Sequence, residues 1–120
     1  MARILVIDDD DVLRTYAAEC LRTEGHEVLE AADGKQGVAV AAAEKPDLVV
    51  TDIMMPGMFG FAVIQDLRAN PDLGRTRIIV SSLNFHADSE AVKSSGADRF
   101  LPKPYPPEAL TSMAAELLAG

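Results

Sequence analysis

The sequence predicts an α/β fold, a doubly wound parallel β-sheet with helices on both faces. Five short apolar runs alternate with stretches of helical period along the 120 residues. Three of these runs, ILVI, LVV and IIV, are continuously apolar, which is typical of parallel strands buried on both faces. Strict alternation of strands and helices with right-handed crossovers gives this class of sheet. The length suits one domain, residues 1–120, around one core.

The apolar runs are the predicted strands, and their carboxyl ends all lie at one edge of the sheet. We place the strands at residues 3–7, 27–30, 47–51, 77–81 and 99–101. Ligands of such folds bind outside the carboxyl ends of the strands. Residues that follow the strands are therefore the first candidates for a functional site.

Helix boundaries follow from capping and breaking residues. The first helix ends near Gly25 and has an apolar face of Leu13, Tyr16, Ala17, Cys20 and Leu21. Asp33 opens the second helix, which stops before Pro46. Pro106 and Pro107 start the last helix, whose inner face is Leu110, Met113, Ala114 and Leu117. The two other helices, at residues 61–68 and around residues 91–92, rest on apolar periodicity.

Charge and cysteine content exclude several classes of protein. The net charge of −8 repels phosphate backbones, so we expect no direct binding of nucleic acid, whereas metal cations and basic partner surfaces suit it. The apolar runs are too short to span a membrane. The single cysteine, Cys20, cannot form an internal disulfide and is expected in the core, which fits a reducing cytoplasm.

Four consecutive aspartates, Asp8–Asp11, follow the first predicted strand. Two unit charges about 4 Å apart repel by roughly 4 kcal/mol at an effective dielectric constant near 20. We interpret Asp10 and Asp11 as an N-cap and its dipole complement at the start of the first helix. Asp8 and Asp9 lie nearer the end of the strand than a cap should, which favours binding of a metal ion.

Chemically distinct side chains meet at the predicted sheet edge. Asp8 and Asp9 end the first strand, Asp52 the third and Lys103 the fifth, while Ser81 and Ser82 end the fourth. Three carboxylates form an oxygen-rich site that Mg²⁺ fills while it keeps several waters. A lysine beside them is compatible with an incoming phosphoryl group. An aspartate between metal and lysine can act as a covalent nucleophile towards phosphorus.

These residues resemble the receiver domain of two-component response regulators. The motifs "VIDDDDVLR", "DLVVTDIMMPGMFGF", "IIVSS" and "GADRFLPKPY" occur in the order of that family and cover essentially the whole chain. The resemblance implies a flavodoxin-like, three-layer fold: five parallel strands in the order 2-1-3-4-5 and five helices. It also implies a cis peptide bond between Lys103 and Pro104.

The resemblance assigns roles to the acidic residues and the lysine. Asp52 would be the phospho-acceptor. Asp8 and Asp9 would bind Mg²⁺ together with Asp52 and the backbone carbonyl of Met54. Lys103 would pair with the phosphoryl oxygens. The protein would then catalyse only its own phosphoryl transfer and a slow autodephosphorylation.

The same resemblance implies a switch and its partners. The hydroxyl of Ser82, with Ser81 as the fallback, would bind the phosphoryl group and draw in the loop of residues 83–87. Phe100 would then turn inward and remodel the surface of the fourth helix, fifth strand and fifth helix. A sensor histidine kinase or histidine phosphotransfer protein would donate the phosphoryl group, and a separate effector protein would bind that surface of this stand-alone domain.

Three residues depart from the usual pattern of the family. Phe59 stands where an aspartate is common, and Phe100 lacks the frequent tyrosine hydroxyl, so no hydrogen bond can fix its inward state. Leu83 follows the switch serine, where the family usually has a small residue. We expect this bulky side chain to narrow the access to Asp52 and to slow loading from small phosphodonors.

Other functions stay open on the residues alone. A phosphate-independent interaction module is one, although the intact acidic residues argue against it. A metal-dependent phosphohydrolase would want an acid–base carboxylate at Met54, and a flavin-binding relative would need a phosphate loop where the four aspartates stand. His26 and His86 lack the spacing of metal ligands and are expected at the surface.

Overall fold

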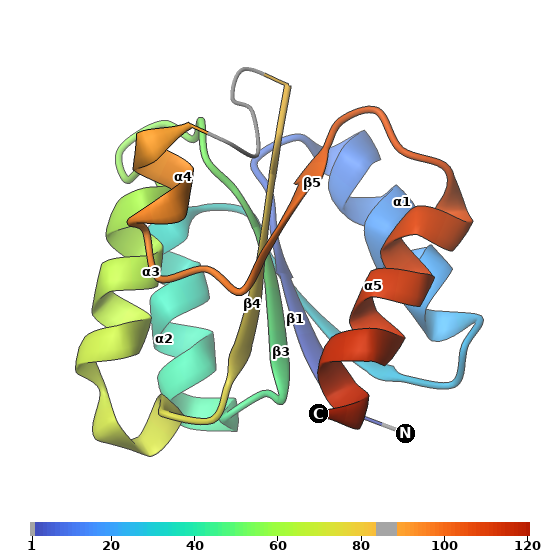
Figure 1. Ribbon diagram of the computed structural model, residues 1–120, viewed down its shortest axis with the longest axis horizontal. Coiled ribbons are helices and arrows are strands. Elements are labelled where there is room, and N and C mark those ends of the chain that lie inside the picture. The colour runs from blue at the N-terminus through green and yellow to red at the C-terminus, as the bar shows by residue number, and fades with distance from the viewer. Residues whose placement is uncertain (1, 84–88) are drawn as a thin grey trace.

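The computed structural model describes residues 2–83 and 89–120, and it has the predicted parallel sheet with helices on both faces (Figure 1). The strands are β1 (Arg3–Ile7), β2 (Glu27–Ala31), β3 (Leu48–Asp52), β4 (Arg77–Ser82) and β5 (Arg99–Pro102). The helices are α1 (Asp11–Arg22), α2 (Gly34–Glu44), α3 (Gly60–Ala69), α4 (Glu90–Lys93), α5 (Pro107–Ala119) and the 3₁₀ turn η1 (Pro71–Leu73). All strand pairs are parallel, and the order β2-β1-β3-β4-β5 confirms the expected topology.

Two apolar clusters, one on each face of the sheet, make up the core. On one face α1 and α5 cover the cluster around Ile4, Val6 and Ile79. On the other face α2, α3 and α4 cover the cluster around Leu5, Ile7 and other buried residues (Figure 1). Successive residues of β1 contribute to opposite clusters because side chains alternate along a strand. This double burial explains the continuously apolar runs in the sequence.

Four of the predicted strands differ from the observed ones by one residue at an end. β2, β4 and β5 each extend one residue further than predicted, and β3 begins and ends one residue later. The carboxyl-end differences have one cause: Ala31, Asp52, Ser82 and Pro102 still pair with a neighbouring strand, although polar or breaking residues interrupt the apolar pattern. All four lie at the carboxyl edge of the sheet, where the functional site was expected.

The predicted helix caps are present. The carboxylate of Asp10 accepts hydrogen bonds from the backbone N–H groups of Val12 and Leu13, and Asp11 lies in the first turn of α1. The carboxylate of Asp33 likewise accepts from the N–H of Gln36 at the start of α2. Two of the four consecutive aspartates, Asp10 and Asp11, therefore lie at the start of α1 in the roles that we predicted, as the N-cap and as an acidic residue of the first turn.

Of the residues without an assigned role, Cys20 lies as expected and His26 does so only in part. Cys20 is a buried free cysteine in the α1–α5 cluster. His26 is part-buried rather than fully on the surface, and its Nδ1 accepts a hydrogen bond of 3.1 Å from the N–H of Ala2. His86 lies outside the described residues. In the described part of the chain, no helix is long and apolar enough to cross a membrane.

Candidate functional site

The aspartates Asp8, Asp9 and Asp52 meet at the carboxyl edge of the sheet. Each offers a carboxylate oxygen, and these oxygens lie within 4.8 Å of one another. Asp8 is buried and Asp9 is exposed, so the cluster opens to solvent on one side. The predicted convergence of these carboxylates at the ends of β1 and β3 is thus confirmed.

Asp8 is held by backbone contacts on each side. Its N–H donates to the carbonyl oxygen of Ala31 at 3.1 Å, and its Oδ1 accepts from the N–H of Asp10 at 3.0 Å. The Nη1 group of Arg14 donates to the carbonyl oxygen of Asp8 at 2.8 Å. These bonds fix the direction of the carboxylate at the junction between β1 and α1.

Asp52 ends β3, and its side chain is only 13% exposed. Its Oδ1 accepts a hydrogen bond of 2.7 Å from the N–H of Ile53. Burial is the largest influence on this carboxyl group and raises its pKa above the usual value. The positive charge of Lys103 works against that shift, and the negative charge of Asp8 adds to it.

Among the described residues, Lys103 is the only one whose positive charge pairs with these carboxylates. Its Nζ lies 2.7 Å from Oδ2 of Asp8 and 3.5 Å from Oδ2 of Asp52. The side chain is 7% exposed, so the ion pair with Asp8 is largely shielded from water. The peptide bond between Lys103 and Pro104 is cis, as the family resemblance implied.

Gly60 lets the start of α3 come close to the end of β3. Its N–H donates to the carbonyl oxygen of Ile53 at 2.8 Å. A Cβ atom built at Gly60 would overlap the backbone carbonyl oxygen of Asp52 and would lie 2.8 Å from the Cα atom of Ile53. The sequence did not predict this role of Gly60, because a single glycine at a helix start carries no signal of such a contact.

The two serines at the end of β4 differ in what they can do. The hydroxyl of Ser81 is buried and donates to the carbonyl oxygen of Leu101 at 2.6 Å, which argues against its use as the fallback switch residue. Ser82 is also buried, and its carbonyl oxygen accepts from the N–H of Lys103 at 3.2 Å. Phe100 is half-buried and packs against the cluster beneath α3 and α4.

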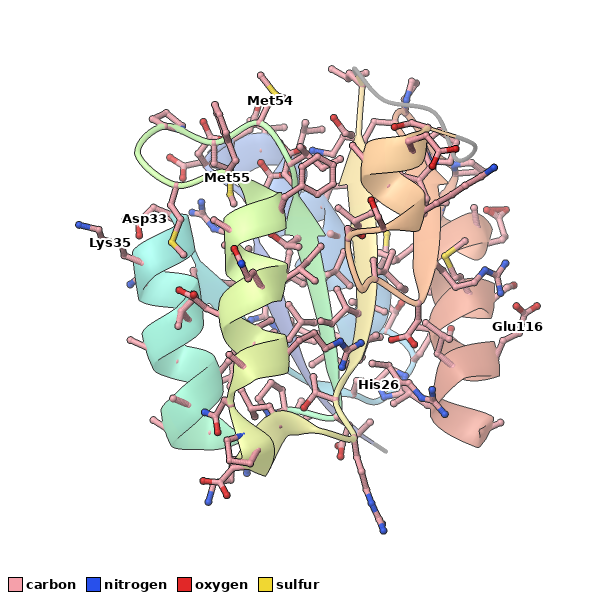
Figure 2. The ribbon with its side chains drawn as sticks, turned by 60° about the vertical axis from the view of Figure 1, so that its left-hand side comes forward. His26, Asp33, Lys35, Met54, Met55 and Glu116 are labelled. Atoms are coloured by element: carbon pink, nitrogen blue, oxygen red, sulfur yellow. The ribbon has the colours of Figure 1, made fainter. Side chains whose placement is uncertain are left out.

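Some large apolar side chains are exposed on segments that follow the carboxyl ends of the strands. Among the described residues, this group consists of Val12, Met54, Phe59 and Leu83. Figure 2 shows Met54 pointing away from the body of the protein at this edge. Beside Lys103 lies a hollow of about 400 Å³, lined by Val12, Leu13, Tyr16, Leu83, Lys103, Pro104 and Tyr105. Leu83 is 66% exposed at its mouth. Its effect on access to Asp52 stays a prediction, because residues 84–88 lie outside the described part.

The donor set fits a hard divalent cation. It consists of oxygen atoms only, it carries three carboxylates against one ammonium group, and the exposed carboxylate of Asp9 leaves an entry path. Such a cation binds through one or more carboxylates and keeps several waters. Asp8, Asp9 and Asp52 are therefore the residues that could hold a divalent metal ion.

The raised pKa of Asp52 allows us to predict how the free energy of unfolding depends on this residue and on pH. A carboxyl group whose pKa is higher in the folded state than in the unfolded state favours folding when protonated and opposes it when charged. In a chelating buffer, Asp52→Asn should therefore be more stable than the wild type at neutral pH. The difference should shrink as the pH falls through the raised pKa towards the ordinary value.

Urea denaturation across the acid range measures this difference. Asp66→Asn, which neutralises an exposed carboxylate on α3, is the matched control and should show little effect at any pH. A wild type that is the more stable of the two at neutral pH would mean that the ion pair with Lys103 outweighs burial.

Two side chains around the site make contacts that were not predicted. The guanidinium group of Arg14 donates to Asp8, Asp11 and Glu30 at once. The hydroxyl of Tyr16 donates to the carbonyl oxygen of Tyr105, 89 residues away. The sequence placed Tyr16 on the inner face of α1, and a buried tyrosine hydroxyl needs a partner. That partner is a backbone group, which no side-chain pattern reveals.

Comparison with known proteins gives a consistent result. The family model described as "Response regulator receiver domain" matches residues 4–115. Protein PilH of Pseudomonas aeruginosa is 38% identical, and the match covers 100% of both chains. The chain spans about half the length of several other curated relatives.

Solved structures agree with the sequence matches. The chemotaxis response regulator CheY4 of Vibrio cholerae superposes with a TM-score of 0.91 at 30% identity, covering 98% of each chain. The receiver domain of the sensor histidine kinase PA1611 of Pseudomonas aeruginosa, which holds a magnesium ion coordinated in its active-site cleft, also has a TM-score of 0.91. It is 27% identical, and the match covers 99% of this chain and 98% of that one. The chain therefore belongs to the family of response regulator receiver domains.

Proposed function

We propose that residues 1–120 form a phosphorylation-controlled signalling switch in which Asp52 accepts a phosphoryl group. The observation that carries this proposal is the position of Asp52. Its carboxylate lies with those of Asp8 and Asp9 on one side and the ammonium group of Lys103 on another. Membership of the receiver family supports it, because that family acts in two-component signalling.

The donor is a phosphohistidine of a histidine kinase or a histidine phosphotransfer protein. A carboxylate oxygen of Asp52 attacks phosphorus, an O–P bond forms, and the N–P bond to the imidazole breaks. The phosphoimidazole carries a proton on its other ring nitrogen, so that when the electron pair of the broken bond stays on the imidazole the leaving group is neutral histidine. Lys103 lies where its ammonium group can pair with the oxygens of the transferred group.

We infer that Mg²⁺ binds to Asp8, Asp9, Asp52 and the backbone carbonyl of Met54. The metal ion supplies positive charge that neutralises the phosphoryl oxygens. The protein residues orient the acceptor: the N–H of Ile53 holds Oδ1 of Asp52, and Arg14 and Asp10 hold Asp8. The magnesium ion in the related PA1611 receiver domain supports this assignment.

Phosphorylation adds about −1.5 to −2 charges at Asp52. The hydroxyl of Ser82 is drawn towards the new oxygens, and Phe100 turns inward, which remodels the surface of α4, β5 and α5. This change is a population shift, and the phosphoryl group drives it only as far as it stabilises one state over the other. An effector protein reads that surface.

Partners of the chain are proteins. The apolar hollow beside Lys103 and the exposed apolar residues around the site suit a donor protein that docks there. The net charge of −8 disfavours direct binding of nucleic acid. The chain acts in the cytoplasm as a switch rather than as an enzyme with a separate substrate, apart from its own phosphoryl transfer and slow autodephosphorylation.

The test is incubation with acetyl phosphate or phosphoramidate, with and without Mg²⁺, followed by intact-mass measurement. We expect one added phosphoryl group that requires Mg²⁺ and is absent in Asp52→Asn. Asp66→Asn is the matched control and should be loaded like the wild type. If neither small donors nor a phosphorylated histidine phosphotransfer protein produced an adduct, the chain would be a phosphate-independent interaction module instead.

A further inference from the structure

We propose that Tyr16 is a positioning residue that fixes the ammonium group of Lys103 in the acidic site, an inference that rests on the function proposed above. The hydroxyl of Tyr16 donates a hydrogen bond of 2.9 Å to the backbone carbonyl of Tyr105. The two rings also pack against each other, with centroids 5.7 Å apart and planes inclined by 44°. This contact joins α1 to the segment that follows Lys103.

Two prolines limit the backbone hydrogen bonds that the segment after Lys103 can donate. Pro104 and Pro106 have no N–H group to donate. The N–H of Lys103 donates to the carbonyl oxygen of Ser82, which fixes the segment on the side of β4. Beyond Lys103, the carbonyl of Tyr105 is the group that α1 holds. The backbone of Lys103 therefore lies between two hydrogen-bonded anchors.

Three contacts link α1, Asp8 and the segment around Lys103 to one another. In the first turns of α1, Arg14 donates to the carbonyl oxygen of Asp8 at 2.8 Å. Two residues later on the same helix, Tyr16 holds Tyr105. The third contact is the hydrogen bond of 2.7 Å between Nζ of Lys103 and Oδ2 of Asp8. Because α1 is anchored to Asp8, the hydrogen bond of Tyr16 sets where the backbone of Lys103 lies relative to that carboxylate.

The hydroxyl of Tyr16 is a dependable donor in this position. A phenol keeps its proton at neutral pH without any help, and burial, the largest influence on this one, raises its pKa further. A phenylalanine at this position would keep the ring contact with Tyr105 and lose the hydrogen bond to the carbonyl of Tyr105, together with the contact of the hydroxyl with the thiol of Cys20. The variant Tyr16→Phe therefore removes the anchor and keeps the aromatic ring.

The first readout is the side-chain ammonium signal of Lys103 in ¹⁵N NMR spectra. The chain has four lysines, Lys35, Lys45, Lys93 and Lys103, so the signals can be assigned by substitution. In Tyr16→Phe we expect the signal of Lys103 to shift and its protons to exchange with water about threefold faster or more, because the local structure opens more often. The signals of the other three lysines should not change.

The second readout is the rate of loading with phosphoramidate and Mg²⁺. We expect Tyr16→Phe to slow it about three- to tenfold, because a small displacement of a reacting group lowers the rate steeply. In a Lys103→Ala background the same substitution should have no further effect, since the two residues act through one group. An effect that persisted in that background would overturn the proposal.

The matched control is Thr76→Val. The hydroxyl of Thr76 is buried and donates to the carbonyl oxygen of Pro46 at 2.8 Å, at the opposite edge of the sheet. This variant loses a similar long-range bond and should change neither the Lys103 signal nor the loading rate. An unchanged Lys103 signal in Tyr16→Phe would overturn the proposal. Absence of loading in the wild type from both phosphoramidate and a phosphorylated histidine phosphotransfer protein would instead overturn the proposed function, and the NMR signal would still decide the role of Tyr16.

Discussion

Lys103→Ala is expected to slow phosphoryl transfer to Asp52 by about 10²- to 10³-fold, the usual loss when one preorganised charged donor is removed. The ammonium group lies 3.5 Å from Oδ2 of Asp52 and is largely shielded from water. An alanine leaves no cation there to pair with the transferred oxygens. Single-turnover loading with phosphoramidate and saturating Mg²⁺ measures the loss.

The same variant should bind Mg²⁺ more tightly than the wild type. The ammonium group of Lys103 lies 2.7 Å from Oδ2 of Asp8, so it competes for the charge that a metal ion would use. Without Mg²⁺ the variant should be less stable by about 3 kcal/mol, because breaking a buried ion pair leaves an uncompensated charge. Mg²⁺ should restore much of that stability.

Tighter metal binding together with slower phosphoryl transfer would show that the role of Lys103 is not purely structural. Lys35→Ala is the matched control, because Lys35 is exposed and its side chain points into solvent at the start of α2 (Figure 2). That variant should load at the wild-type rate. Wild-type loading by Lys103→Ala would instead show that the lysine acts only to balance the charge of the carboxylates.

The convergence of Asp8, Asp9, Asp52 and Lys103 could be predicted because it depends on topology. Each of these residues lies at or just beyond the carboxyl end of a strand, and parallel strands bring those ends to one edge. Continuous apolar runs are a strong signal of such strands. The N-caps at Asp10 and Asp33 were predictable for a similar reason, since a cap acts within a few residues along the chain.

The features that the sequence did not predict depend on backbone groups or on distant partners. The end of β3 was placed one residue early, because Asp52 pairs through its backbone while its side chain breaks the apolar pattern. The 3₁₀ turn η1 was not expected, although Asn70 caps it and Pro71 starts it, because a three-residue element has no measurable period. The hydrogen bond between Tyr16 and Tyr105 spans 89 residues and ends on a carbonyl, which every residue possesses.

The helix α4 shows that apolar periodicity cannot predict the length of a very short helix. The sequence predicted a helix around residues 91–92, and α4 is four residues long with Val92 as its buried residue. Ser89 caps it through a hydrogen bond to the N–H of Val92. An element of one turn is stabilised mainly by its cap and by one apolar contact. Its length therefore could not be read from a pattern of repeating positions.

Gly60→Ala is expected to destabilise the protein by about 1–3 kcal/mol or more, the range for forcing extra atoms into a packed site. The added Cβ would overlap the backbone carbonyl oxygen of Asp52. That neighbour is backbone and cannot rotate away, so α3 must move from the end of β3. Urea denaturation in a chelating buffer measures the loss.

Gly74→Ala is the matched control for this substitution. A Cβ at Gly74 would lie 3.6 Å from the carbonyl oxygen of Pro71, an ordinary contact, and its φ of −60° suits any residue. That variant should be neutral or more stable by about 0.4–1 kcal/mol, because alanine restricts the unfolded chain. Because the clash falls on Asp52 itself, Gly60→Ala should also slow phosphoryl loading under conditions in which it is still fully folded. If Gly60→Ala were as stable as Gly74→Ala and loaded normally, the close approach of α3 to Asp52 would have no part in shaping the site.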